Sequence, residues 1–319
     1  MSSKRGIFGA WEIPNLVLIS AQKDSVTGEI VDRLLRRGWK FSHMTDNIRE
    51  GFSALEDGEA SVLLIEDSHD LPASLVLRGQ LSNPTALLTP TMVAASDDQP
   101  DKALFKEIGM PEVIDAPIHP ARFIESLEFM LRRWSTGNLA RIWDVRKLLV
   151  KKQSTEAMKA LTTMVGTSEL MPLLAPAIAH GIRRLNDAKV VEKVLLNAIR
   201  EFPRNLGIIL STIDFYLHMA MPDTALKVIE AAKKNHGNPN LVIPEQIQAK
   251  LMLNEVDQCI PLLKELMKAN YMPKTAKVFL SRCLYAEGHV EDFMNSIDHQ
   301  IILLDQFKQA WTRKTGESA

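Results

Sequence analysis

The chain has 319 residues, of which 46% are hydrophobic and 24% are charged. This composition is typical of soluble globular proteins, and the length favours about two domains. The formal net charge of −1 is too small to indicate a nucleic-acid-binding protein. No apolar run reaches the length of a membrane span, and the first residues lack the pattern of a secretory signal peptide. Cys259 and Cys283 lie at apolar helical positions, so we expect reduced thiols in a cytoplasmic protein.

After a lead-in at residues 1–14, residues 15–134 alternate short apolar runs with amphipathic segments. The predicted strands are residues 16–19, 39–44, 61–65, 86–88 and 113–114. The predicted helices are residues 26–35, 47–55, 74–81, 102–108 and 120–134. Parallel strands need crossover helices, so this order predicts an α/β domain with a doubly wound parallel five-stranded sheet.

A 34-residue period runs through the second half of the chain. One position of this period holds small or apolar residues in four copies and a larger one in the last: Ala157, Val191, Ala225, Cys259 and Phe293. Four residues later the period gives Leu161, Leu195, Ile229, Leu263 and Ile297. Three residues beyond these it gives Met164, Ala198, Ala232, Leu266 and, as the exception, Gln300. These offsets lie on one helical face, which is the pattern of stacked helical hairpins.

Each copy of the period is predicted to form a helix, a polar turn, a second helix and a break. The copies start at residues 138, 172, 206, 240 and 274, and prolines mark several of the joints between them. We therefore predict an all-α solenoid of five hairpins over residues 138–300. Residues 301–319 are predicted to add a capping helix and a tail, because terminal copies of such arrays are atypical.

The order of elements in residues 14–134 resembles the receiver domain of bacterial two-component response regulators. The resemblance places the phosphoacceptor pocket of that family on these residues: Ser20, Ala21, Gln22, Glu66, Asp67, Thr89 and Ala116. Receivers need an acidic pair for Mg²⁺ and a lysine, and here those positions hold Ser20, Ala21 and Ala116. Phosphoryl transfer depends on such cations, so the resemblance implies a degenerate receiver that uses neither metal nor cofactor. Such a domain would dock a partner or form a homodimer.

The hairpins resemble tetratricopeptide repeats in a divergent form. The small residue that opens the second helix of that family matches Ala157, Val191 and Ala225, and Pro203 matches the proline that ends a copy. Helices of this kind line a groove that binds a peptide or a helix. The resemblance places one row of groove residues on Arg146, His180, Asp214, Gln248 and Arg282, with Arg183, Arg184, His218 and Tyr285 nearby.

No motif in the sequence indicates catalysis. The eight histidines have no metal-ligand spacing, and no Walker loop or serine elbow occurs. The sequence therefore favours a bacterial signalling adaptor that is not an enzyme. Two alternatives remain open: a working response regulator phosphorylated at Asp67 or Glu66 that controls exposure of the groove, and a nucleotide-sensing regulatory subunit of a larger complex.

Overall fold

The chain folds into two compact units, Met1–Phe215 and Tyr216–Ala319. The computed structural model describes residues 14–21, 26–68, 70–95, 105, 108, 111–115, 118–183, 188–235, 239–269, 273–289 and 292. Within these ranges, no helix combines the length and the apolar character that crossing a membrane requires.

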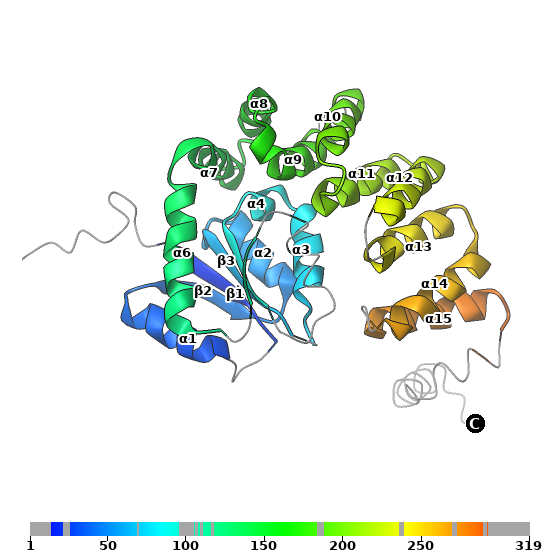
Figure 1. Cartoon of the computed structure of the whole chain (residues 1–319), viewed down its shortest axis with the longest axis horizontal. Helices are drawn as coiled ribbons and strands as arrows, with labels where there is room; N and C mark the ends of the chain where they lie inside the picture. Colours follow the sequence, from blue (N-terminus) through cyan, green and yellow to red (C-terminus); the bar gives the residue numbers. More distant parts are fainter. Residues whose placement is uncertain are drawn as a thin grey trace, which may run out of the picture. The chain divides into compact units, whose positions relative to one another are not determined.

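The first unit contains a five-stranded parallel sheet with the strand order β2-β1-β3-β4-β5. The strands are β1 (Asn15–Ile19), β2 (Lys40–Thr45), β3 (Val62–Glu66), β4 (Thr91–Ala95) and β5 (Glu112–Asp115). This order is that of flavodoxin-like doubly wound folds. Every residue of β3 and β4 is buried, as expected for central strands covered on both faces. The parallel sheet of the predicted α/β domain is confirmed (Figure 1).

Helices pack on both faces of this sheet. They are α1 (Val26–Arg36), α2 (Ile48–Glu56), α3 (Ala73–Leu81), α4 (Pro84–Leu87) and α6 (Pro120–Trp134). Helix α1 packs against α6, whereas α2, α3 and α4 contact one another. The sequence fixes several helix starts locally: the Asn47 side chain accepts hydrogen bonds from the first turn of α2, and Pro120 occupies the first turn of α6.

The prediction of the fourth strand was wrong. Residues 86–88 lie at the end of α4 and just after it, and β4 begins only at Thr91. Asn83 caps α4 by accepting a hydrogen bond from the Ala86 amide, and Pro84 stands in the first turn, where proline favours a helix. A short apolar run fits a buried helix as well as a buried strand, so hydrophobicity alone did not separate the two.

Helical hairpins follow the sheet. The first unit continues with α7 (Gly137–Val150), α8 (Ser154–Thr163), the 3₁₀ helix η1 (Ser168–Leu170), α9 (Met171–Arg183) and α10 (Ala188–Glu201). Helix α11 (Leu206–His218) contains the boundary between the units. The second unit contains α12 (Pro222–Asn235), the 3₁₀ helix η2 (Pro239–Val242), α13 (Ile243–Met252), α14 (Val256–Lys268) and α15 (Pro273–Ala286). Within the units, helices that follow one another in the chain pack together, among them α7 with α8, α9 with α10 and α13 with α14 (Figure 1).

The predicted 34-residue period is visible in the helices. The second helices of four successive hairpins begin at Ser154, Ala188, Pro222 and Val256, which are 34 residues apart. The predicted apolar face is buried in all four copies: Ala157, Leu161, Met164, Val191, Leu195, Ala198, Ala225, Ile229, Ala232, Cys259, Leu263 and Leu266. The face read from the sequence is therefore the packing face of the hairpins.

Some predicted segments lie outside the described residues. These are the lead-in up to residue 13, most of the helix at 102–108, the second helix of the fifth hairpin except Asp292, and residues 301–319. Phe105 and Ile108, the two residues described in the 102–108 segment, are helical and buried.

Candidate functional site

Two residues of the predicted phosphoacceptor pocket meet at the carboxyl edge of the sheet. Ser20 follows β1 and Glu66 ends β3, and the strand order reverses between these two strands. Open α/β sheets bind ligands at this point. The Ser20 hydroxyl donates a short hydrogen bond to Oε2 of Glu66. Ala21, beside Ser20 in the chain, has no ligand atom in its side chain. A hydroxyl and one carboxylate make a weaker set of Mg²⁺ ligands than several carboxylates would.

Asp67 is buried and serves the local fold. Its Oδ1 accepts a hydrogen bond from the amide of Ala73, the first residue of α3, at 2.9 Å. The backbone N–H of Asp67 continues the sheet by donating to the carbonyl of Ala94. This carboxylate therefore caps a helix whose N-cap residue, Pro72, makes no side-chain cap bond.

Thr89 does not lie with Ser20 and Glu66. Because β4 begins at Thr91, Thr89 precedes that strand and lies at the amino edge of the sheet, opposite the edge that holds Glu66. The predicted placement of Thr89 after the fourth strand was therefore wrong, for the same reason as the strand itself. Gln22 and Ala116 lie outside the described residues.

Arg146, predicted to line an open groove, is buried against the amino edge of the sheet. It comes from α7 and is 3% exposed. Its Nε donates to Oγ1 of Thr89 at 2.7 Å, and its Nη2 donates to the carbonyls of Leu55 at 3.2 Å and Ala60 at 2.6 Å. The guanidinium also lies over the Trp143 ring, 5.2 Å from its centroid. These contacts join the first helical hairpin to the α/β domain.

The Arg146 cation is held by dipoles and an aromatic face. Burial lowers the pKa of Arg146 to about 10, so the guanidinium stays charged at neutral pH. Among the described residues, no carboxylate lies within ion-pair distance of it. A buried charge without a counter-ion is costly unless its donors are satisfied, and two backbone carbonyls and a hydroxyl satisfy them here.

Two further contacts hold α7 against the turn between α2 and β3. Gly58 in this turn has a φ of +77°, and a Cβ built on it would lie 2.6 Å from Cγ1 of Val150. Lys152, just after α7, lies 3.8 Å from Asp57 through its Nζ. The absence of a side chain at residue 58 therefore allows the end of α7 to approach the turn closely.

His180 is the second predicted groove residue that is buried. It lies on α9, is 6% exposed, and places its Nε2 3.7 Å from Oδ2 of Asp214 on α11. The structure thus brings together two members of the predicted row from neighbouring copies. Arg184 and the side chain of Arg183 lie outside the described part of the chain.

The second unit contains an open apolar groove between α13, α14 and α15. Its volume is 290 Å³. The residues that line it include Ile247, Gln248, Leu251, Leu263, Leu266 and Phe279. Gln248 is the one of these that the sequence had placed in the groove, and its side chain is exposed. Such a groove can bind apolar side chains of a short segment, which is how helical grooves bind their ligands.

Other predicted groove residues of the second unit are exposed. Arg282 lies on α15 with its Cζ 5.9 Å from the centroid of the Phe279 ring. Tyr285, one turn further along α15, is 70% exposed, and His218 is exposed at the end of α11. The groove residues predicted from the sequence were polar positions and did not include Leu251 and Phe279. An apolar residue on a helix is assigned to the core unless the neighbouring helices are known.

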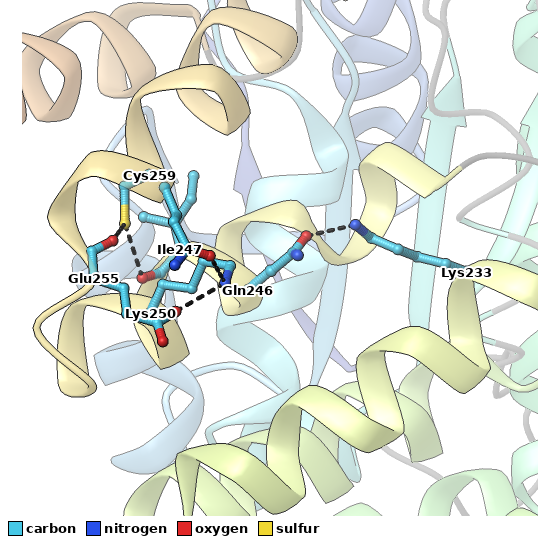
Figure 2. A network of polar contacts seen from close by, with 7 residues as sticks. Lys233, Gln246, Ile247, Lys250, Glu255 and Cys259 are labelled. Atoms are coloured by element: carbon cyan, nitrogen blue, oxygen red, sulfur yellow. Dashed lines mark hydrogen bonds and ion pairs between the residues drawn. The ribbon is translucent and has the colours of Figure 1, made fainter.

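A polar network connects α13 to its neighbours α12 and α14 in the second unit (Figure 2). On one side, Lys233 of α12 donates to Oε1 of Gln246 on α13. On the other, Lys250 of α13 donates to Oε2 of Glu255 at 3.0 Å, and the Cys259 thiol of α14 lies 3.8 Å from the carbonyl of Ile247. Helix α13, which supplies Ile247, Gln248 and Leu251 to the groove, is therefore fixed from both sides.

A separate polar cleft of 470 Å³ lies in the first unit, where α6 passes into α7. Ion pairing and hydrogen bonding already occupy its charged groups, because Arg133 pairs with Glu112 and Asn138 donates to Oε1 of Glu169 at 3.0 Å. Within the described residues, no three histidine, cysteine or acidic side chains gather as a metal site would require.

Comparison with known proteins gave no relative: no family model matches the chain, and searches of curated proteins and of solved structures found no match.

Proposed function

We propose that this chain is a non-catalytic adaptor of bacterial signalling, and that it binds a segment of a partner protein in the groove of its second unit. The observation that carries the proposal is the apolar groove between α13, α14 and α15, with Phe279 at its edge 38% exposed. Exposed apolar surface in a concave site is typical of protein-binding surfaces. The resemblance to tetratricopeptide repeats supports the same conclusion.

Burial favours the second unit over the first as the place of binding. Arg146 and His180, at the groove positions of the first two hairpins, are buried within the first unit. Gln248 and Arg282, at the same positions of the fourth and fifth hairpins, are exposed. A partner therefore meets accessible side chains of this row on α13 and α15.

The α/β domain acts, in this proposal, as a degenerate receiver that docks a second protein or a second copy of the chain. The hydrogen bond from Ser20 to Glu66 and the capping role of Asp67 support this proposal, because both carboxylates at the end of β3 are engaged within the fold. The proposed adaptor works in the bacterial cytoplasm and needs no cofactor for binding.

A peptide-display selection against the full chain tests the adaptor function. The matched variant is Gln248→Trp, which adds an aromatic ring at an exposed position of the groove and leaves the core of α13 intact. We expect peptides that bind the natural chain and are lost from the variant, because the ring occupies the space of their apolar side chains. If the selection enriches no peptides beyond those that also bind Gln248→Trp, the groove is not a protein-binding site and the adaptor proposal fails.

A further inference from the structure

The exposed face of α15 combines apolar side chains with one cation. Val278 and Phe279 are 39% and 38% exposed, and Tyr285 is 70% exposed. These residues and Arg282 recur at intervals of three and four along α15, so they lie on one side of the helix. Phe279 belongs both to this face and to the groove. Groove and face therefore form one continuous surface, which we call the α15 surface.

Charge on this surface has one sign. Between Ala276 and Ala286, helix α15 carries Lys277 and Arg282 and no acidic residue. Within the described part of the chain, no carboxylate lies within ion-pair distance of the Arg282 guanidinium, which lies 5.9 Å from the centroid of the Phe279 ring. A guanidinium that lies over an aromatic ring can still donate hydrogen bonds from the N–H groups at its edges.

The size of the groove limits its occupant. A volume of 290 Å³ is at the lower end of pockets that bind small molecules, so it admits a few apolar side chains and excludes a folded domain. Ile247, Leu263 and Leu266 belong to the buried core of the second unit and form the floor of the groove. Half-buried Leu251 and exposed Phe279 are the apolar side chains within reach of a ligand, and Gln248 offers a neutral polar group at the rim. None of the described residues that line the groove is charged, so the charge of the α15 surface is that of Arg282, which lies over the Phe279 ring.

We infer that the α15 surface binds a short protein segment in which apolar side chains stand next to a carboxylate. The apolar side chains enter the groove against Leu251 and Phe279, and the carboxylate accepts hydrogen bonds from Arg282. This inference rests on the proposed function and adds the chemistry of the partner. A planar guanidinium is suited to this role because it can donate two parallel hydrogen bonds to one carboxylate.

The test uses pairs of synthetic peptides taken from the display selection, in which each Asp or Glu is replaced by its amide. Binding to the full chain is measured by fluorescence anisotropy at low and at moderate salt. We expect each acidic peptide to bind roughly two- to fivefold more tightly than its amide partner, which is the usual contribution of an exposed ion pair. The difference should shrink as salt rises, since the pair lies at an exposed rim.

Three variants locate the effect. Arg282→Ala should remove the preference for the acidic peptide and leave the binding of the amide peptide nearly unchanged. Phe279→Ala should weaken both peptides, because it removes a wall of the groove. Lys227→Ala, an exposed cation on α12 with the same change in net charge, is the control and should preserve the preference.

The outcomes separate this inference from the proposed function. Peptides that bind in the groove with equal affinity in acidic and amide forms, or with an unchanged preference in Arg282→Ala, would overturn the carboxylate inference and leave the adaptor function standing. A selection dominated by basic peptides would overturn it as well. Absence of any groove-dependent peptide would overturn both.

Discussion

At the scale of single residues, Arg146 is the buried cation that joins α7 to the α/β domain. Its guanidinium reaches three acceptors that are far from it in the sequence: Leu55, Ala60 and Thr89. Two of these are backbone carbonyls, one at the end of α2 and one just before β3. Sequence reasoning placed Arg146 in a polar row facing solvent, because a charged residue is usually exposed. Its burial depends on a fold contact between segments about 90 residues apart, as in the bond to Leu55.

Replacing Arg146 by Ala should therefore destabilise the first unit strongly. The change leaves a cavity and removes the donors of three buried acceptors, and we expect the free energy of unfolding in urea to fall by about 3 kcal/mol. Arg146→Lys should recover only part of this loss, since an ammonium group lacks the planar fork of donors. Arg141→Ala, on the exposed side of the same helix, is the control. A loss at Arg146 no larger than at Arg141 would contradict the role given to the guanidinium.

At the scale of elements, the approach of α7 to the turn between α2 and β3 depends on a residue without a side chain. Gly58 combines a left-handed backbone with direct contact with Val150. Two separate penalties therefore oppose any larger residue there: the conformational cost of φ +77° and the overlap with the end of α7.

A double-mutant cycle separates these penalties. Gly58→Ala should cost at least about 1–2 kcal/mol of unfolding free energy from the backbone alone, with the overlap added to it. Combining it with Val150→Ala should recover the overlap and leave the backbone cost. Gly28→Ala, in a helix with open space around it, should be neutral or stabilising. Thermal and urea unfolding check all four variants, and strict additivity of the changes at 58 and 150 would show that α7 does not press on the turn.

The sequence predicted most elements because their patterns are local. Four of the five strands and most helices of the α/β domain follow from apolar runs, caps and prolines, and the 34-residue register identified the packing face of the hairpins. The fourth strand failed where a cap and a proline turned an apolar run into α4. The sequence predicted a groove but not the residues that line it. The exposure of Phe279 and the burial of Arg146 depend on which helices pack against each other, and this cannot be deduced from local patterns.

At the scale of the whole molecule, the chain is built from two units whose unfolding can be followed with different probes, tryptophan fluorescence for the first and cysteine labelling for the second. Cys259 and Cys283 are both buried in the second unit, and burial raises the pKa of Cys259 from 9.0 to about 11. A buried thiol that stays protonated at neutral pH reacts slowly with alkylating reagents. Trp39, Trp134 and Trp143 lie in the first unit and report on its packing.

Unfolding should therefore follow two separate transitions. In a chain carrying Trp11→Phe and Trp311→Phe, tryptophan fluorescence reports the first unit and pulsed thiol labelling reports the second. We expect different urea midpoints, because each unit has its own core. As pH rises from about 9 toward 11, the labelling transition should move to lower urea, since the unfolded thiol of Cys259 loses its proton before the folded one does. Coincident midpoints at every pH would mean that the units unfold as one.

The contact made by Arg146 also limits the positions at which the chain can be cut and joined to another protein. A cut after Trp134 would separate the guanidinium from Leu55, Ala60 and Thr89, whereas a cut beyond α9 would leave the α/β domain with the hairpin that closes its amino edge. Helix α9 also contacts α4, and Asn205 donates a hydrogen bond to the carbonyl of Ile108. The portion that can be inherited or transplanted intact is thus the first unit, Met1–Phe215, and gain or loss of hairpins is tolerated only further along the chain.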